Sequence, residues 1–157
     1  MKKERKYYLF DLNNPENNIC KSIVTELSEE QMHSDIEELL DTVDESDSLS
    51  SKVLYYLRRK KLSSKDMYER AYIDRRLLHK ITKNPKYHPS KKTVFALCVA
   101  FELNYHESIE LLGLASYSFS PNSKYDTLFA YFLSRGIYDI DVINDILYEY
   151  GYPCIGD

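Results

Sequence analysis

The segment LSSKDMYERAYIDRRLLHKI, residues 62–81, carries the strongest indication of the fold of this chain. Ser63 and Asp66 stand three positions apart and form a capping box, which predicts that a short helix begins here. A brief turn follows, and Asp74 is a suitable N-cap for a second helix. Apolar side chains recur at helical spacing and are expected to face a core: Met67, Ala71, Leu77, Leu78 and Ile81. The segment therefore predicts two helices joined by a tight turn.

The second of these helices, residues 75–83, has a basic outer face. Arg76, His79, Lys80 and Lys83 recur at helical spacing, and Arg75 stands at the start. Such a helix fits the major groove of DNA, where Arg and Lys donate to guanine O6 and N7. The predicted base-contacting residues are Arg75, Arg76, His79 and Lys80. The predicted phosphate-contacting residues, which flank the stripe or lie near helix N-termini, are Lys60, Lys61, Ser64, Lys65, Lys83, Lys91 and Lys92.

Three further helices are expected around this pair. One precedes it, with an apolar stripe of Leu49, Val53, Leu54 and Leu57 that ends at the basic run 58–61. Another follows a break at Pro89, is capped by Ser90 and carries Val94, Leu97, Ala100 and Phe101 on its apolar side. The last is capped by Asn104 with Glu107 and is expected to stop at Gly113. Five short helices with brief turns predict a compact bundle.

Residues 50–115 resemble the lambda-repressor-like (Xre-like) helix-turn-helix family. The matching segments are 62–67 for the second helix, 71–74 for the turn, 75–81 for the recognition helix, and Pro89 to Phe101 and Asn104 to Leu112 for the fourth and fifth helices. The resemblance implies sequence-specific binding of duplex DNA, often as a homodimer on a palindromic site. Tyr68 and Tyr72 stand where the family prefers a small residue and glycine. That glycine serves a backbone φ above zero, a conformation in which a tyrosine would be strained, so Tyr68 and Tyr72 are departures from the family pattern.

Charge is distributed very unevenly behind a formal net charge of −4. Residues 51–96 carry 14 basic and 3 acidic side chains, a net charge of +11. Residues 1–50 have a net charge of −8, and residues 97–157 have a net charge of −7. A basic block between two acidic ones favours a polyanionic partner for the block, since the distribution of charge matters more than the total.

The N-terminal part reads as an acidic arm. Ser28 and Gln31 form a capping box, and apolar residues at helical spacing predict an amphipathic helix over about 28–43. Carboxylates crowd residues 35–47, and a polar linker follows the helix. This run is interpreted as a solvated face, or as a surface for the protein's own basic block or a basic protein partner. Residues 7–10, two tyrosines followed by Leu9 and Phe10, suit a short strand or a packing arm.

The C-terminal part predicts an αα-hairpin rich in tyrosine. Ser120 and Pro121 are expected to start its first helix, which carries Tyr125, Leu128, Phe129 and Phe132 and ends at Gly136. The second is expected to carry Val142, Ile143, Ile146, Leu147 and Tyr150 and to end at Gly151. The whole is predicted to be all-α, with an N-terminal arm at 1–47, a five-helix lambda-repressor-like domain at 48–117 and the hairpin at 118–157. The excess tyrosines suit a homodimer interface.

Several functional classes find little support in the sequence. The four histidines and three cysteines form no metal-ligand spacing, and no nucleophile with a base or phosphate-binding glycine loop is evident. We therefore expect no enzyme activity, no cofactor and no metal. No apolar run approaches the roughly 18 residues of a membrane span, and the scattered cysteines suit a cytoplasmic protein.

The function that the sequence favours is sequence-specific binding of double-stranded DNA as a transcriptional regulator. An alternative is a protein-interaction adaptor of a mobile-element or defence system that uses the helix-turn-helix as a scaffold. RNA binding is a weaker option, because no stacking platform is distinct from the core tyrosines.

Overall fold

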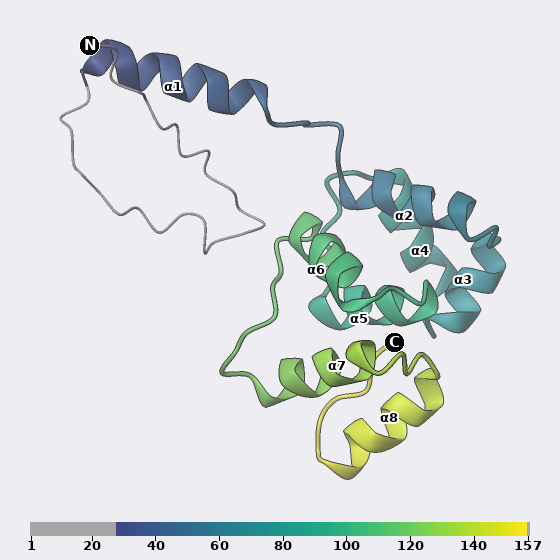
Figure 1. Ribbon diagram of the computed structural model, residues 1–157. Coiled ribbons are helices and arrows are strands. Elements are labelled where there is room, and N and C mark those ends of the chain that lie inside the picture. The colour runs from purple at the N-terminus through teal and green to yellow at the C-terminus, as the bar shows by residue number, and fades with distance from the viewer. Residues whose placement is uncertain (1–27, 157) are drawn as a thin grey trace. The chain divides into compact units, whose positions relative to one another are not determined.

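The computed structural model describes residues 28–156, and the chain divides into two units, Met1–Glu45 and Ser46–Asp157. The described residues form eight helices and no strand, which confirms the all-α prediction (Figure 1). The prediction of a strand or arm at residues 7–10 lies outside the described part of the chain.

The described part of the first unit is one amphipathic helix, α1 (Glu29–Asp41). The Ser28 hydroxyl accepts a hydrogen bond from the Gln31 amide at 3.2 Å, so the predicted N-cap is confirmed. The apolar residues of the predicted stripe are all exposed, with exposed fractions from 37% to 65%: Met32, Ile36, Leu39, Leu40 and Val43. Helix α1 therefore carries an apolar stripe that is not buried.

The second unit contains α2 (Leu49–Arg59), α3 (Ser64–Arg70), α4 (Arg75–Lys83), α5 (Lys91–Ala100), α6 (Tyr105–Leu114), α7 (Lys124–Ser134) and α8 (Ile140–Glu149). Four predicted N-caps begin the helices as expected, at Ser63, Asp74, Ser90 and Asn104. These caps act locally, since each side chain accepts a hydrogen bond from an amide two or three residues further along.

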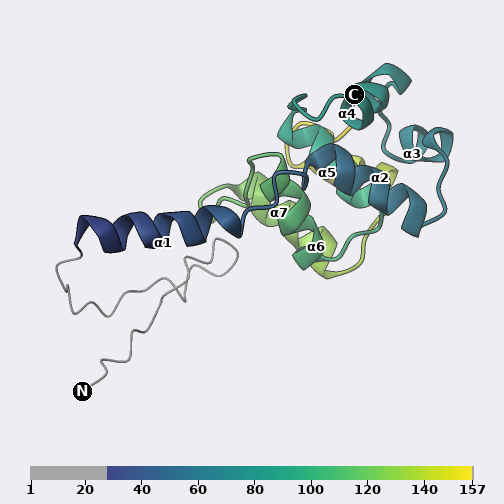
Figure 2. The same cartoon turned by 90° about the horizontal axis from the view of Figure 1, so that it is seen from above.

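Helix α5 forms the centre of this unit, in contact with α3, α6 and α8 (Figures 1 and 2). Every residue from Thr93 to Phe101 is buried, not only the stripe predicted from helical spacing. A helix that is covered on all sides needs no polar face, which explains the apolar run from Val94 to Phe101 after the two lysines of the first turn. The Phe95 ring stacks on Phe129 of α7 with centroids 3.9 Å apart.

Two predictions in the bundle are wrong. Leu54 of α2 is 36% exposed, and Tyr56, which lay outside the predicted stripe, is 2% exposed and packs on the Phe101 ring at 5.4 Å. Helix α6 does not stop at Gly113 but continues to Leu114, and the left-handed residue that ends it is Ser116, with φ 59°. Gly113 does not take the positive φ by which glycine usually ends a helix, and so it remains inside α6.

The hairpin also differs from its prediction in detail. Ser123, not Ser120 before Pro121, caps α7, and its hydroxyl accepts from the Asp126 amide at 3.2 Å. Val142 and Tyr150 are 44% and 68% exposed rather than buried. Gly136 and Gly151 do end the two helices, with φ of +66° and +75°. Helices α2–α8 form one compact unit, so the hairpin packs directly on the five helices before it.

Candidate nucleic-acid interface

Helix α4 is anchored at both ends. The Asp74 carboxylate accepts a hydrogen bond from the Arg76 amide at 2.7 Å. Near the other end, the Ser50 hydroxyl of α2 donates to the Thr82 carbonyl at 2.7 Å. Leu78 and Ile81 seal the inner face, with exposed fractions of 2% and 1%. The cap stabilises the start of α4 locally, while the bond from Ser50 and the buried inner face keep the outer face turned to solvent.

The five basic side chains predicted on this outer face are all exposed: Arg75, Arg76, His79, Lys80 and Lys83. Across residues 28–156, none of the five forms an ion pair with a carboxylate. Lys80 Nζ lies 6.0 Å from the centroid of the Tyr87 ring, a neighbour that the sequence analysis missed. The structure thus gathers all four predicted base-contacting residues on one accessible stripe.

Most of the flanking lysines also remain accessible. Lys60 and Lys61 are exposed where α2 ends, and Lys92 is half-buried in the first turn of α5. Lys65 pairs with Glu69 at 3.8 Å, but both side chains are more than half exposed. An exposed pair of this kind contributes little and yields readily to a phosphate.

Lys91 is the exception among the predicted phosphate contacts, and the structure gives it a different role. Its ammonium lies 2.5 Å from Oδ2 of Asp126, whose side chain is only 3% exposed. The same oxygen accepts a hydrogen bond from the Ser120 amide at 2.7 Å. Because release of Lys91 would leave a buried carboxylate without its countercharge, this lysine holds the hairpin to α5 and is not available to bind a phosphate.

Other cations of the basic block are neutralised by carboxylates of α6. Lys52 pairs with Glu110 at 3.6 Å, and Arg59 pairs with Glu107 at 3.7 Å. These two cations differ from the five on α4, which have no carboxylate partner among the described residues. The acidic residues after position 97 balance part of the basic block, so the net charge of the block overstates what a ligand would meet.

Ser64 lies at the first position of α3, beside a charged carboxylate. The hydrogen bond from the Ser63 hydroxyl lowers the pKa of Asp66 most, and the hydrogen bond from the Ser63 backbone amide lowers it further. Asp66 therefore stays ionised at the α3 N-terminus and already accepts the Ser63 amide. A phosphate at Ser64 would lie close to this negative charge, which opposes the contact.

The turn between α3 and α4 holds Tyr72 in a conformation that glycine would adopt without strain. Tyr72 has φ of 50°, in the left-handed region that favours glycine. Its hydroxyl donates to both carboxylate oxygens of Asp141, each at 2.9 Å. The pairing joins residues 69 positions apart, and no signal in the sequence pointed to it.

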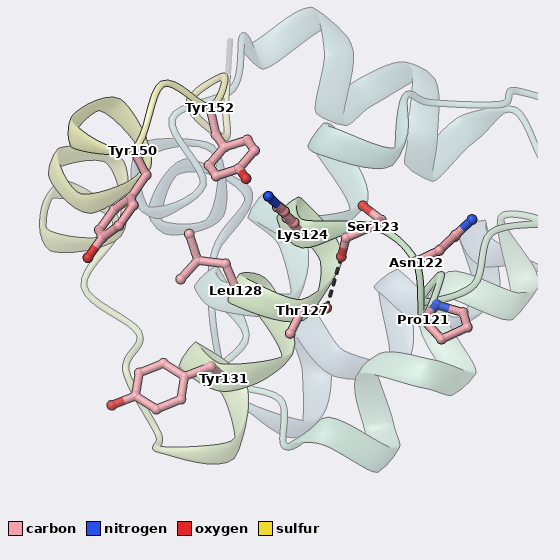
Figure 3. A pocket seen from close by; sticks show the side chains of 9 residues that line it. All are labelled: Pro121, Asn122, Ser123, Lys124, Thr127, Leu128, Tyr131, Tyr150 and Tyr152. Carbon is pink, nitrogen blue, oxygen red and sulfur yellow. Dashed lines mark hydrogen bonds between the residues drawn. The ribbon is translucent and has the colours of Figure 1, made fainter.

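An open groove lies on the hairpin, and no residue of α4 lines it. It has a volume of about 380 Å³ and runs between α7 and the segment after α8 (Figure 3). Leu128 and Thr127 of α7 line it, together with Tyr131, Tyr150 and Tyr152. With Lys124 as its sole Lys, Arg or carboxylate side chain, the groove offers apolar and hydroxyl contacts rather than acid–base chemistry.

Within residues 28–156, no three His, Cys, Asp or Glu side chains are grouped so that they could hold a metal ion. The same part of the chain contains no helix with the length and apolar character needed to cross a membrane. Comparisons of the chain with protein-family profiles, curated proteins and solved structures find no match.

Proposed function

We propose that the protein binds double-stranded DNA in a sequence-specific manner and acts as a transcriptional regulator. In this proposal α2–α6 take a lambda-repressor-like arrangement and α4 enters the major groove. The observation that carries it is the row of five exposed basic side chains on α4, which form no ion pair within residues 28–156 and whose opposite face is sealed against the core. Arg75, Arg76, His79 and Lys80 would contact bases, as Arg and Lys do at guanine.

The phosphate contacts are proposed to come from the lysines beside α4. Lys60, Lys61, Lys65, Lys83 and Lys92 are the candidates that remain accessible or part-accessible. Ser64 is a weaker candidate because of Asp66, and Lys91 is left out because Asp126 holds it. Each phosphate neutralised should make the slope of log K against log salt concentration more negative by about 0.9.

The test is a fluorescence anisotropy titration of a duplex pool with a random core, at two salt concentrations, followed by sequencing of the bound fraction. Binding that weakens steeply with salt and enriches a common sequence supports the proposal. An enriched palindrome would add the homodimer and its half-site spacing. No binding at low salt contradicts the proposal.

A charge-reversal pair makes the test specific to α4. Arg76→Glu with Lys80→Glu should reduce affinity at least about 100-fold, since two cations are replaced by two anions. The matched control is Lys124→Glu with Arg135→Glu, the same change of charge at two exposed residues of the hairpin. Because Lys124 and Arg135 lie beside the tyrosines of the hairpin, sedimentation must first show that the control keeps the oligomeric state of the wild type. Equal loss of affinity in both variants would then mean that only net charge matters, which would contradict base contacts by α4.

A homodimer in this proposal would form through the hairpin. Tyr131, Tyr148 and Tyr150 are 51%, 80% and 68% exposed, and tyrosine is enriched at protein interfaces. Sedimentation of the full chain and of Tyr148→Ser with Tyr150→Ser tests this independently of DNA. A monomer at concentrations well above the DNA dissociation constant would remove the dimer from the proposal.

The adaptor alternative rests on α1. Its exposed apolar stripe is flanked by carboxylates, which suits an amphipathic helix that docks in a groove of a basic protein partner. An adaptor should keep its protein partner when Arg76 and Lys80 are reversed, whereas a DNA reader should lose its operator. The cytoplasmic location expected for either function agrees with the free thiols of Cys98 and Cys154.

A further inference from the structure

The turn that leads into α4 holds a tyrosine in a conformation that it would not keep unaided. Tyr72 has φ of 50°, and a residue with a Cβ disfavours this left-handed region. The backbone hydrogen bond of Tyr72 is long, since its N–H donates to the Glu69 carbonyl at 3.4 Å. The direction in which the chain enters α4 depends on this residue, because Asp74 caps α4 two positions later.

The first turn of α8 holds the Tyr72 side chain. The hydroxyl donates to both oxygens of Asp141 at 2.9 Å, a charge-assisted contact. Asp141 is itself fixed, since its amide donates to the Asp139 side chain at 3.0 Å and the neighbouring Ile140 is 6% exposed. The Asp141 carboxylate also raises the pKa of Tyr72, so the hydroxyl keeps its proton and continues to donate.

The C-terminal segment holds the backbone of the same turn. A Cβ on Gly156 would lie 2.8 Å from the Tyr72 carbonyl oxygen and 2.9 Å from Tyr72 Cβ, so only glycine permits this approach. Asn144 of α8 holds the segment in place. Its side-chain amide donates to the Ile155 carbonyl at 3.1 Å and accepts from the Ile155 amide at 2.8 Å. Ile155 is 3% exposed and belongs to the core.

We propose that the first turn of α8 and residues 155–156 form a clamp that keeps the α3–α4 turn left-handed and so fixes the direction of α4 for DNA. Asp141 and Gly156 are then positioning residues, which act through Tyr72 and touch no DNA themselves. This inference rests on the proposed function, and it makes DNA binding depend on the docked state of the hairpin. Glycine at position 72 would need no clamp, because glycine adopts positive φ without a Cβ penalty.

The experiment measures duplex affinity for the wild type and four variants: Asp141→Ala, Asp141→Asn, Tyr72→Gly and the double variant Tyr72→Gly with Asp141→Ala. Asp141→Ala is expected to weaken binding about 5-fold, through loss of one hydrogen bond to a charged group on an exposed surface. Asp141→Asn keeps an acceptor oxygen and should restore most of the affinity. In the Tyr72→Gly background, Asp141→Ala should change affinity by less than about 2-fold.

A second readout does not require DNA. Amide hydrogen exchange at Tyr72 and Ile73 should accelerate in Asp141→Ala, and the amides of α5 should exchange as in the wild type. If the wild type ignores DNA but exchange accelerates as expected, the proposed function fails and the clamp stands. Unchanged exchange in Asp141→Ala overturns the clamp, as does an equal loss of affinity in the tyrosine and glycine backgrounds.

Discussion

Removal of the Lys91 ammonium should destabilise the protein strongly without removing a DNA contact. The perturbation is Lys91→Met, which keeps the aliphatic stem beside Phe95, whose ring centroid is 5.6 Å from Nζ. Asp126, 3% exposed, would keep the Ser120 amide as a donor at 2.7 Å but would lose its countercharge. Breaking one partner of a buried ion pair costs about 3–5 kcal/mol.

The expected cost is smaller than that range because Lys91 is only partly buried. Its side chain is 27% exposed, so water can reach the vacated space and solvate part of the carboxylate. We therefore expect a loss of about 2–3 kcal/mol in the free energy of unfolding. For a chain of this size that loss lowers the Tm by roughly 4–12 °C.

Urea unfolding followed by circular dichroism measures this change as a shift of midpoint at constant slope. The matched control is Lys124→Met, an exposed lysine of the hairpin, which should change stability by less than about 0.5 kcal/mol. Lys91→Met with Asp126→Asn should recover part of the loss, since no buried charge remains. A cost below about 1 kcal/mol for Lys91→Met, or one equal to the control, would show that the Lys91–Asp126 pair is not buried enough to matter for stability.

Three further predictions concern glycine, cysteine and tyrosine. Gly113→Ala should stabilise the protein by about 0.5–1 kcal/mol, because Gly113 lies within α6 and an added Cβ would meet nothing within 4 Å. Gly156→Ala should destabilise it by at least about 1–2 kcal/mol, because Gly156 has a φ of +88° and its Cβ position lies against the α3–α4 turn. Thermal unfolding measures both changes. Burial raises the pKa of the Cys98 thiol, so a thiol reagent at neutral pH followed by peptide mass spectrometry should label exposed Cys154 and leave Cys98 unmodified until the protein unfolds; equal labelling of both would contradict the packing of α5. Burial also raises the pKa of Tyr56 from 10.0 to about 12, so its contribution to stability is complete below pH 10 and is lost as the pH rises toward 12. The measurement is the difference in urea midpoint between the wild type and Tyr56→Phe at several pH values from 10 to 12. A difference that does not change with pH would show that the Tyr56 ring is not buried as described.

Local signals in the sequence predicted most helix starts correctly. At Ser63 and Asn104, the cap and its partner lie three residues apart, so their hydrogen bonds form wherever the helix packs. The failed start at Ser120 has a tertiary cause. Its amide is drawn to the Asp126 carboxylate, which Lys91 of α5 also holds, and the helix begins three residues later at the Ser123 cap.

The basic stripe of α4 was also readable from sequence, because helical spacing alone places Arg76, His79, Lys80 and Lys83 on one face. The burial of Tyr56 on α2 was readable too, because it lies seven residues after Leu49 and three after Val53, on the same face of the helix. Leu54 was misplaced because an apolar side chain was assigned to the stripe although its position points away from that face. The tertiary structure adds the partner of Tyr56, the Phe101 ring at 5.4 Å.

The helical class, most of the caps and the cationic face of α4 were predictable from the sequence, because each depends on groups within a turn or two of one another. Helix packing instead sets which cations stay available and how the turn before α4 is held. Lys91 meets Asp126 across 35 positions, and Tyr72 meets Asp141 across 69. Contacts over such separations arise when helices pack, and no spacing along the chain encodes them.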